Sequence, residues 1–212
     1  MVLKVKHTLL SSFLLLLFSW SGFAQRLPEE PLRFHKDYTE NGLIFGTITF
    51  PEIKMRFDNY SLYLNYNTDD KKIHRKNSCH IKIDPTMLVG KHYGELEGGK
   101  TYLFVMEKAP GHYDITSLKL TIFKLFDASP TFTGVSGFTI PFDVTKGSIT
   151  YIGEINVNEY ATKDENVISL KDQFERDKTA LKSKYIRVNW DLAVKSNLQL
   201  FHPNAAEKIS NY

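Results

Sequence analysis

Cysteine is almost missing from this sequence, which has Cys79 alone among its 212 residues. One cysteine cannot form an internal disulfide, so no disulfide framework holds the fold. The sequence also has no large excess of charge of either sign, because 27 basic residues are balanced by 24 acidic ones and the formal net charge is +3. A near-neutral surface gives no electrostatic reason to expect nucleic acid as a partner. With 42% apolar residues, the composition is that of an ordinary globular protein with a hydrophobic core.

Motifs that bind cofactors are missing as well. No glycine motif of the P-loop or dinucleotide-binding type follows any expected strand, so we expect no cofactor. The run Gly134–Gly137 lacks the G-x-S-x-G pattern of a nucleophile elbow, and turn chemistry explains its small residues. The sequence also shows no internal repeat and no low-complexity segment. Strand and turn patterns therefore carry most of its information.

The first 24 residues have the pattern of a signal peptide. Lys4 and Lys6 form a positive n-region, Leu9–Phe18 is apolar, and Gly22–Ala24 places small residues before a cleavage site. The apolar run is short for a membrane span, which needs about 20 residues. We expect cleavage that leaves Gln25 as the first residue of the mature chain, and an uncleaved anchor is the alternative.

The mature chain is expected to carry no lipid anchor. A bacterial lipoprotein needs a cysteine directly after the cleavage site, and Cys79 lies far from it. No later segment approaches 18 apolar residues, so we expect no transmembrane segment in the mature chain. The predicted location is the periplasm or the outside of the cell.

After an extended leader over residues 25–41, apolar residues alternate with a period of two, which is typical of β-strands. The expected strands lie within the ranges 43–50, 60–66, 80–84, 102–106, 112–115, 118–122, 138–144 and 149–157. Turn signals recur between them. The pattern predicts a mainly β fold, a single antiparallel β-sandwich over residues 42–160, with a small barrel as the alternative.

Three local features refine this expectation. Ala109–Gly111 is a strong turn signal, so Thr101–Ser117 is expected to form a β-hairpin. Asp69–Lys72 mixes acids with bases and is expected to be a solvated hairpin tip. Ile149–Val157 has the most regular alternation, which places its apolar residues on one face of a strand.

Near the C-terminus the apolar period changes from that of a strand to that of a helix. Ser169 and Asp172 resemble a capping box at the start of this helix. We expect one amphipathic helix within the segment 161–212, docked on a sheet whose strands are apolar on both faces, as Ile44–Ile48 and Leu103–Val105 are. Its apolar stripe comprises Val167, Leu170, Phe174, Leu181 and Tyr185.

Two motifs and the charged helix that follows them resemble a known group of proteins. The motifs are Pro110-Gly111-His112-Tyr113 and the run Phe142–Gly153, which has the form F-x-V-x-x-G-x-I-x-Y-I-G. This combination is similar to uncharacterised secreted and lipoprotein domains of Gram-negative bacteria that have a prealbumin-like, carboxypeptidase-regulatory-like β-sandwich. The resemblance covers about residues 42–185. It implies this type of sandwich and brings no catalytic residues.

The densest group of potential metal ligands comprises His74, Cys79, His80 and His92. Thiolate and imidazole ligands suit zinc or copper. The His-x4-Cys-His spacing matches no common zinc pattern, however, and neighbouring residues of a strand point to opposite faces. Scattered surface histidines and a structural thiol are the simpler interpretation, so we predict no metal site and no catalytic residue.

The sequence favours one function and leaves two alternatives open. The sequence has no recognisable catalytic motif and no cofactor motif. This favours a non-catalytic module of the cell envelope that binds a protein or a glycan. The 11 tyrosines and 15 phenylalanines fit a sandwich core, and a tyrosine-lined surface would suit such a partner. One alternative is a periplasmic metal-binding protein that uses the four residues above. The other is a hydrolase whose catalytic groups come from separate strands.

Overall fold

The structure is a computed structural model that describes residues 32–51, 55–85, 92–123, 129–162, 165–202 and 210–211. The expected signal peptide and the first part of the leader lie outside these ranges. The strands are β1 Gly42–Thr49, β2 Asn59–Tyr66, β3 Cys79–Ile83, β4 Thr101–Lys108, β5 Gly111–Ile122, β6 Thr131–Val144, β7 Ile149–Val157, β8 Ile168–Lys171, β9 Ala193–Lys195 and β10 Ser210–Asn211. The helices are α2 Lys71–Asn77 and α3 Phe174–Lys184, with 3-10 turns η1 Glu97–Gly99 and η2 Trp190–Leu192. Within the described ranges, no helix is both long and apolar enough to cross a membrane.

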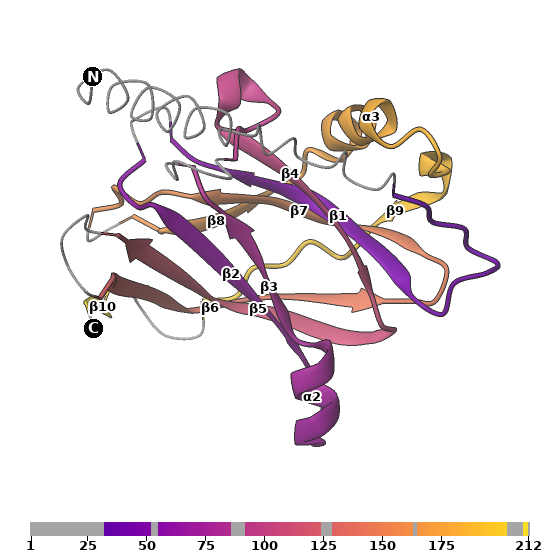
Figure 1. Cartoon of the computed structure of the whole chain (residues 1–212), viewed down its shortest axis with the longest axis horizontal. Helices are drawn as coiled ribbons and strands as arrows, with labels where there is room; N and C mark the ends of the chain where they lie inside the picture. Colours follow the sequence, from indigo (N-terminus) through magenta and orange to yellow (C-terminus); the bar gives the residue numbers. More distant parts are fainter. Residues whose placement is uncertain are drawn as a thin grey trace, which may run out of the picture. The chain divides into compact units, whose positions relative to one another are not determined.

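The strands form two sheets, which confirms the prediction of a mainly β fold (Figure 1). One sheet has the order β10-β6-β5-β2-β3, and all its strand pairs are antiparallel. The other sheet has the order β4-β1-β7-β8, with β9 also paired to β7. In this sheet β7 pairs in parallel with both β1 and β9. We call the two the antiparallel sheet and the mixed sheet; the prediction of purely antiparallel pairing is wrong for the second.

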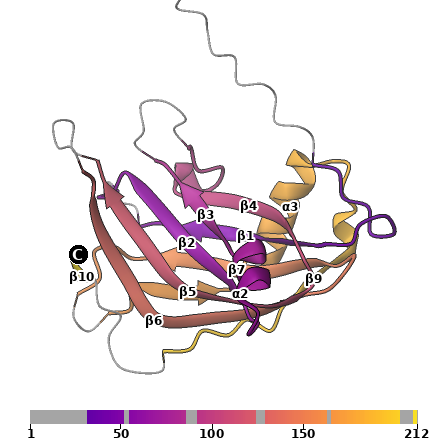
Figure 2. The same cartoon turned by 60° about the horizontal axis from the view of Figure 1, so that its bottom comes forward.

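The main core lies between the sheets and follows the predicted alternation (Figure 2). On β2, Tyr60, Leu62 and Leu64 face inward and are at most 2% exposed. On β1, Ile44 and Ile48 do the same. Because side chains of a strand alternate between faces, the intervening residues of β1 point to the outer side of the mixed sheet.

The turn at Ala109–Gly111 connects the two sheets rather than two strands of one hairpin. β4 pairs with β1 in the mixed sheet, whereas β5 pairs with β2 and β6 in the antiparallel sheet. The predicted hairpin over Thr101–Ser117 is therefore wrong, although the turn lies where it was expected. A Cβ on Gly111 would come within 2.4 Å of the Tyr66 ring, so glycine permits this close crossing.

The alternation in β7 changes faces in the middle of the strand. Ile149 and Tyr151 pack on the outer side of the mixed sheet, whereas Ile152 and Ile155 belong to the main core. Gly153 has a φ of 110° and lies where the pairing of β7 with β1 shifts in register. The extra residue is typical of a β-bulge. The single apolar face predicted for the whole of residues 149–157 is therefore wrong.

The segment predicted as one helix divides into a strand and a helix. β8 runs antiparallel to β7, and α3 begins at Phe174. Val167 and Leu170 of the predicted stripe therefore do not lie on α3, while Phe174 and Leu181 do and are buried. The predicted capping box is replaced by a hydrogen bond of 3.1 Å from the Phe174 amide to Asp172 Oδ1.

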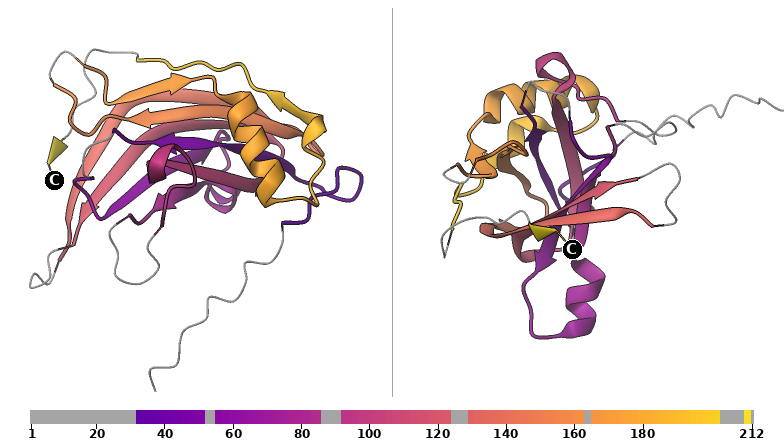
Figure 3. Two further views of the ribbon diagram at one scale, coloured as in Figure 1. Left: turned by 90° about the horizontal axis from the view of Figure 1, so that it is seen from above. Right: turned by 90° about the vertical axis from the view of Figure 1, so that its left-hand side faces the viewer.

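A second apolar cluster covers the outer face of the mixed sheet, where α3 lies across the strands (Figure 3). Its buried members are Phe34, Leu43, Phe45, Ile149, Tyr151, Phe174, Leu181, Val188 and Trp190. The Phe45 ring lies 5.2 Å from the Tyr151 ring and 5.3 Å from the Trp190 ring, measured between centroids. Phe34 comes from the segment expected to be an extended leader, so the second half of that segment is packed against the sheet.

Asp69–Lys72, the expected hairpin tip, instead starts the helix α2. Asp70 is its N-cap and accepts hydrogen bonds from the amides of Lys72 and Ile73, at 2.8 and 3.1 Å. Aspartate is among the preferred residues at this position because its carboxylate satisfies amides that have no partner within the helix. The connection between β2 and β3 is therefore helical.

Candidate functional site

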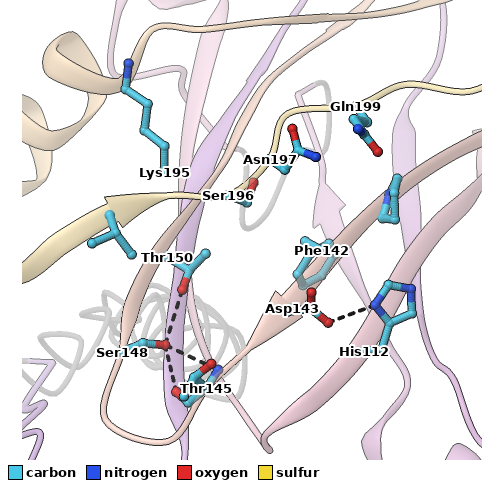
Figure 4. A pocket seen from close by; sticks show the side chains of 12 residues that line it. His112, Phe142, Asp143, Thr145, Ser148, Thr150, Lys195, Ser196, Asn197 and Gln199 are labelled. Atoms are coloured by element: carbon cyan, nitrogen blue, oxygen red, sulfur yellow. Dashed lines mark hydrogen bonds and ion pairs between the residues drawn. The ribbon is translucent and has the colours of Figure 1, made fainter.

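A hollow of about 340 Å³ opens at the edge of the two sheets, where β6 turns into β7 (Figure 4). It is lined by β5, β6, the β6–β7 turn, β7, β9 and the segment that follows β9. We call it the edge pocket. Its polar lining includes His112, Asp143, Ser148, Thr150, Asn197 and Gln199.

The register of β5 with β6 creates one wall of the edge pocket. His112 lies directly across from Asp143, and its Nδ1 is 2.9 Å from Asp143 Oδ1. The Nε2 of the same ring lies 3.6 Å from Asp114 Oδ1, so the imidazole stands between two carboxylates. The His112 side chain is 46% exposed and that of Asp143 is 79% exposed. This pair therefore offers hydrogen-bonding atoms to a ligand from solvent.

The β6–β7 turn forms a second wall and uses its own polar groups locally. Gly147 has a φ of 71°, which glycine adopts without strain. The Ser148 hydroxyl donates to the Thr145 carbonyl at 2.7 Å and lies 3.2 Å from Thr150 Oγ1. Figure 4 shows these residues across the pocket from His112. Ser148 thus stabilises the turn instead of contacting the imidazole.

The third wall is the segment after β9, which crosses from the mixed sheet to the antiparallel sheet. The Ser196 amide donates to a carbonyl of β7 at 2.9 Å. Phe201 exchanges two backbone hydrogen bonds of 2.9 Å with Thr139 of β6. Between these two attachments, Asn197 and Gln199 line the pocket (Figure 4). The segment is held at both sides of the pocket, which fixes where these amides lie.

The lining provides hydrogen-bond donors and acceptors but little positive charge. Side-chain amides and hydroxyls both donate and accept, whereas the Asp143 carboxylate only accepts. Lys195 is among the lining residues, but its ammonium binds Asp172 Oδ2 at 2.6 Å and points away from the pocket in Figure 4. The site is therefore better suited to a neutral ligand rich in hydroxyl groups than to an anion.

The two motifs of the family resemblance meet beside the edge pocket. Tyr113 and Phe142 lie across from each other, and their rings stack with centroids 5.5 Å apart and planes 7° apart. Both rings are buried in the main core. Their neighbours His112 and Asp143 consequently point to the other face of the sheet, and at this edge both of them line the pocket together with Phe142. This adjacency is the one signal in the sequence that would have located the site.

The four potential metal ligands do not form one site in the described part of the chain. His74 lies on α2, and its Nδ1 is 2.7 Å from a backbone carbonyl of β2. Cys79 and His80 are consecutive residues of β3. His92 Nδ1 accepts a hydrogen bond of 3.3 Å from the Asp84 amide. Among the described residues, no three His, Cys, Asp or Glu side chains are grouped so that they could hold a metal ion.

Cys79 has a lysine as its partner. The Lys108 ammonium donates to the Asn77 carbonyl at 2.6 Å and to Cys79 Sγ at 3.2 Å. Lys108 is only 9% exposed, and a buried ammonium is costly without acceptors. The thiol therefore helps to satisfy a buried charge.

Two buried carboxylates lie between α3 and the mixed sheet. Glu154 is 3% exposed and Asp177 is fully buried. Arg176 binds both, through Nη2 to Glu154 and through Nε to Asp177 Oδ1 at 2.8 Å. The other oxygen of Asp177 accepts from Thr47 Oγ1 at 2.8 Å and from the Tyr151 hydroxyl at 3.2 Å. Such a satisfied network attaches α3 to β1 and β7 and leaves Asp177 closed to a substrate.

Another buried carboxylate, Glu159, joins the segment after β7 to β2. Glu159 is 1% exposed, and it accepts hydrogen bonds from the Tyr60 hydroxyl and, at 2.9 Å, from the Arg56 amide. Burial raises the pKa of Glu159 above its ordinary value. Burial, reinforced by the nearby carboxylate, also raises the pKa of Tyr60. The pair is a structural connection inside the core.

Comparison with known proteins gives no family for this chain. No protein-family model and no curated protein matches it. Among solved structures, a leucine-rich repeat protein from Bacteroides thetaiotaomicron aligns with a TM-score of 0.32 and 12% identity. That alignment covers 69% of this chain and 16% of the other. So low a score carries no argument about fold or function, and the edge pocket has to be interpreted from its own chemistry.

Proposed function

We propose that this chain is a non-catalytic module of the bacterial cell envelope that binds a neutral glycan in the edge pocket. The observation that carries the proposal is the mixture of amides, hydroxyls, a carboxylate and an imidazole around one hollow of about 340 Å³. Ligand sites commonly measure about 300–1,000 Å³. A site at the lower end of this range, lined by groups that both donate and accept, suits one or two sugar units.

Apolar surface in the same pocket supports a sugar as the ligand. Val194 is 54% exposed and, with Pro141, lines the pocket among the polar groups. A sugar ring has an apolar C–H face as well as hydroxyls, so a mixed lining can contact both. The sequence allowed a protein or a glycan partner, and a small, mixed pocket favours the glycan.

The hydrolase alternative receives no support from the contacts in the edge pocket. An activated serine needs a hydrogen bond to its base. Ser148 donates instead to Thr145, and His112 binds Asp143. The metal-binding alternative likewise has no observation in its favour.

The proposal includes the finer fold assignment and the location. We propose a prealbumin-like sandwich with α3 docked on its mixed sheet, and burial of Phe174 and Leu181 against that sheet supports this. We also propose that the mature chain begins at Gln25, without a lipid, in the periplasm or outside the cell. The intact mass of the exported protein tests the location; a retained N-terminus or a fatty-acid adduct would contradict it.

Titration with defined glycans tests the function. Chemical shifts of backbone amides are recorded while neutral oligosaccharides, namely maltotriose and N,N′-diacetylchitobiose, are added to the labelled protein. We expect shifts around Asn197 and His112, and N197A and D143A should each weaken binding by about five- to tenfold, because each removes one hydrogen-bonding group. T179A and S183A remove exposed hydroxyls on α3 and serve as matched controls. Glycan binding that is unchanged in the pocket variants, or a ligand that proves to be a protein, would refute the proposal.

A further inference from the structure

The helix α2 projects beyond the antiparallel sheet as a short spur between β2 and β3 (Figures 1 and 3). Its base is fixed to the sheet by several hydrogen bonds. His74 Nδ1 lies 2.7 Å from the Tyr66 carbonyl, and the Tyr66 amide donates to Ser78 Oγ at 2.9 Å. Asp70 caps the first turn. The spur is therefore held in a definite position by the strands that flank it.

Four exposed cations cover the spur, namely Lys71, Lys72, Arg75 and Lys76. None of them forms an ion pair with a residue in the described ranges. With 3.6 residues per turn, these positions share an arc of about 140°. His74, which is bonded to β2, lies outside this arc. The cations consequently form one continuous face that is directed away from the attachment to the sheet.

This arrangement lowers the stability of the helix that carries it. Lys71 and Arg75, and likewise Lys72 and Lys76, are like charges four residues apart, which repel each other. The two lysines of the first turn also lie where the helix dipole favours acidic residues. No acidic residue occurs in that turn. A partner of opposite charge would remove this repulsion, which indicates a binding role for the face.

The shape and chemistry of the spur indicate the kind of partner. The four cations surround a shallow hollow of their own, and Ile73 beside them is 43% exposed. A projecting tip can approach a flat surface without interference from the sheets. Lysines and arginines beside an exposed apolar residue are typical of segments that bind at the interface of an anionic membrane. We propose that α2 is a membrane-contact spur that binds the phosphate headgroups of an anionic lipid bilayer.

The spur and the edge pocket lie at the same end of the antiparallel sheet. Tyr66, the last residue of β2, pairs with Tyr113, which follows His112 in β5. A bilayer in contact with α2 would therefore lie at the end of the sheet that carries the pocket. The membrane proposal does not rest on the glycan proposal, because it involves none of the residues that line the edge pocket.

Vesicle sedimentation with two charge-matched variants tests the proposal. The spur variant carries K71Q, K72Q, R75Q and K76Q, and the control variant carries K36Q, K82Q, K146Q and K182Q at exposed positions elsewhere. Wild type and both variants have the same N-terminus, so its contribution cancels in the comparison. Partitioning is measured on vesicles of phosphatidylcholine alone and of phosphatidylcholine mixed with phosphatidylglycerol.

We expect the wild type to prefer the mixed vesicles and to dissociate at high salt. The spur variant should partition at least about 100-fold more weakly on the mixed vesicles, since each cation near an anionic surface contributes roughly fivefold. The control variant should keep most of the binding. Because glutamine removes repulsion within α2, the spur variant should also melt at or above the wild-type temperature, so lost binding cannot be attributed to unfolding. Equal partitioning of wild type on both kinds of vesicle, equal losses in the two variants, or tighter binding to an acidic polysaccharide than to the vesicles would overturn the proposal.

Discussion

Truncation of Phe174 to alanine tests whether α3 is held by a second core. Phe174 is the first residue of α3 and is 8% exposed. Its ring centroid lies 5.5 Å from that of Tyr151 and 6.1 Å from that of Phe45. The ammonium groups of Lys178 and Lys195 lie 4.7 and 5.3 Å from it. Alanine would remove all these contacts and leave a cavity between the helix and the mixed sheet.

The expected loss in the free energy of unfolding is about 3–5 kcal/mol, the usual cost of truncating a buried phenylalanine. For a domain of about 150–250 residues, each 1 kcal/mol lowers Tm by about 2–4 °C. The variant should therefore melt about 6–20 °C below wild type. The dependence of the unfolding free energy on urea concentration should stay unchanged, because the folded state remains equally compact.

Urea titration and thermal melting, both followed by circular dichroism, provide the measurement. Ile186→Ala is the control, since Ile186 lies two residues beyond the end of α3 and is 82% exposed. It should change the unfolding free energy by no more than about 0.5 kcal/mol. If Phe174→Ala melts like wild type, burial against the mixed sheet does not hold α3. If it also loses association with itself or a partner, the apolar face of α3 is an interface instead.

Three further substitutions test other parts of the structure. Gly153→Ala should destabilise the protein by about 1–3 kcal/mol, because the φ of 110° is strained for alanine and its Cβ would lie 2.5 Å from Leu170 Cδ1. Thermal melting measures this loss. An unchanged Tm would show that the backbone at this bulge does not require glycine. Thr47→Val removes a hydrogen bond of 2.8 Å to the buried carboxylate of Asp177 and should lower the free energy of unfolding by about 1.5–3 kcal/mol. Urea titration measures this loss, and an unchanged free energy of unfolding would contradict the role of the hydrogen bond. Glu159→Gln tests the raised pKa of that carboxyl group. A carboxyl group whose pKa is higher in the folded than in the unfolded protein adds to the stability of the folded state. This contribution is complete at a pH below the unfolded-state pKa, and it is lost as the pH rises through the folded-state pKa. Wild type should therefore lose stability relative to Glu159→Gln as the pH rises above about 4.3, the ordinary pKa of a glutamate, and parallel curves would contradict the shift.

Local patterns in the sequence determined the class of the fold. The alternation in β2 is a property of neighbouring residues, because a strand exposes successive side chains to opposite faces. Ala109–Gly111 specified a turn for the same local reason. The apolar residues on both faces of β1 likewise indicated a sheet that is covered on each side, as the two apolar clusters show. These features needed no knowledge of which strands pair.

Only the tertiary structure decided which segments lie beside each other. The turn at Ala109–Gly111 joins two sheets because β4 pairs with β1 and β5 pairs with β2. Both pairings connect residues that are far apart in the sequence. Ile168–Lys171 continues the helical spacing of the apolar residues of α3, yet its hydrogen bonds to β7 make it a strand. The pairing decides the outcome because a short segment has only a weak intrinsic preference for helix or strand. The edge pocket depends on the same effect. His112, Asp143 and Asn197 meet only through the register of β5 with β6 and the attachment of the C-terminal segment to both sheets, and no spacing in the sequence encodes such contacts.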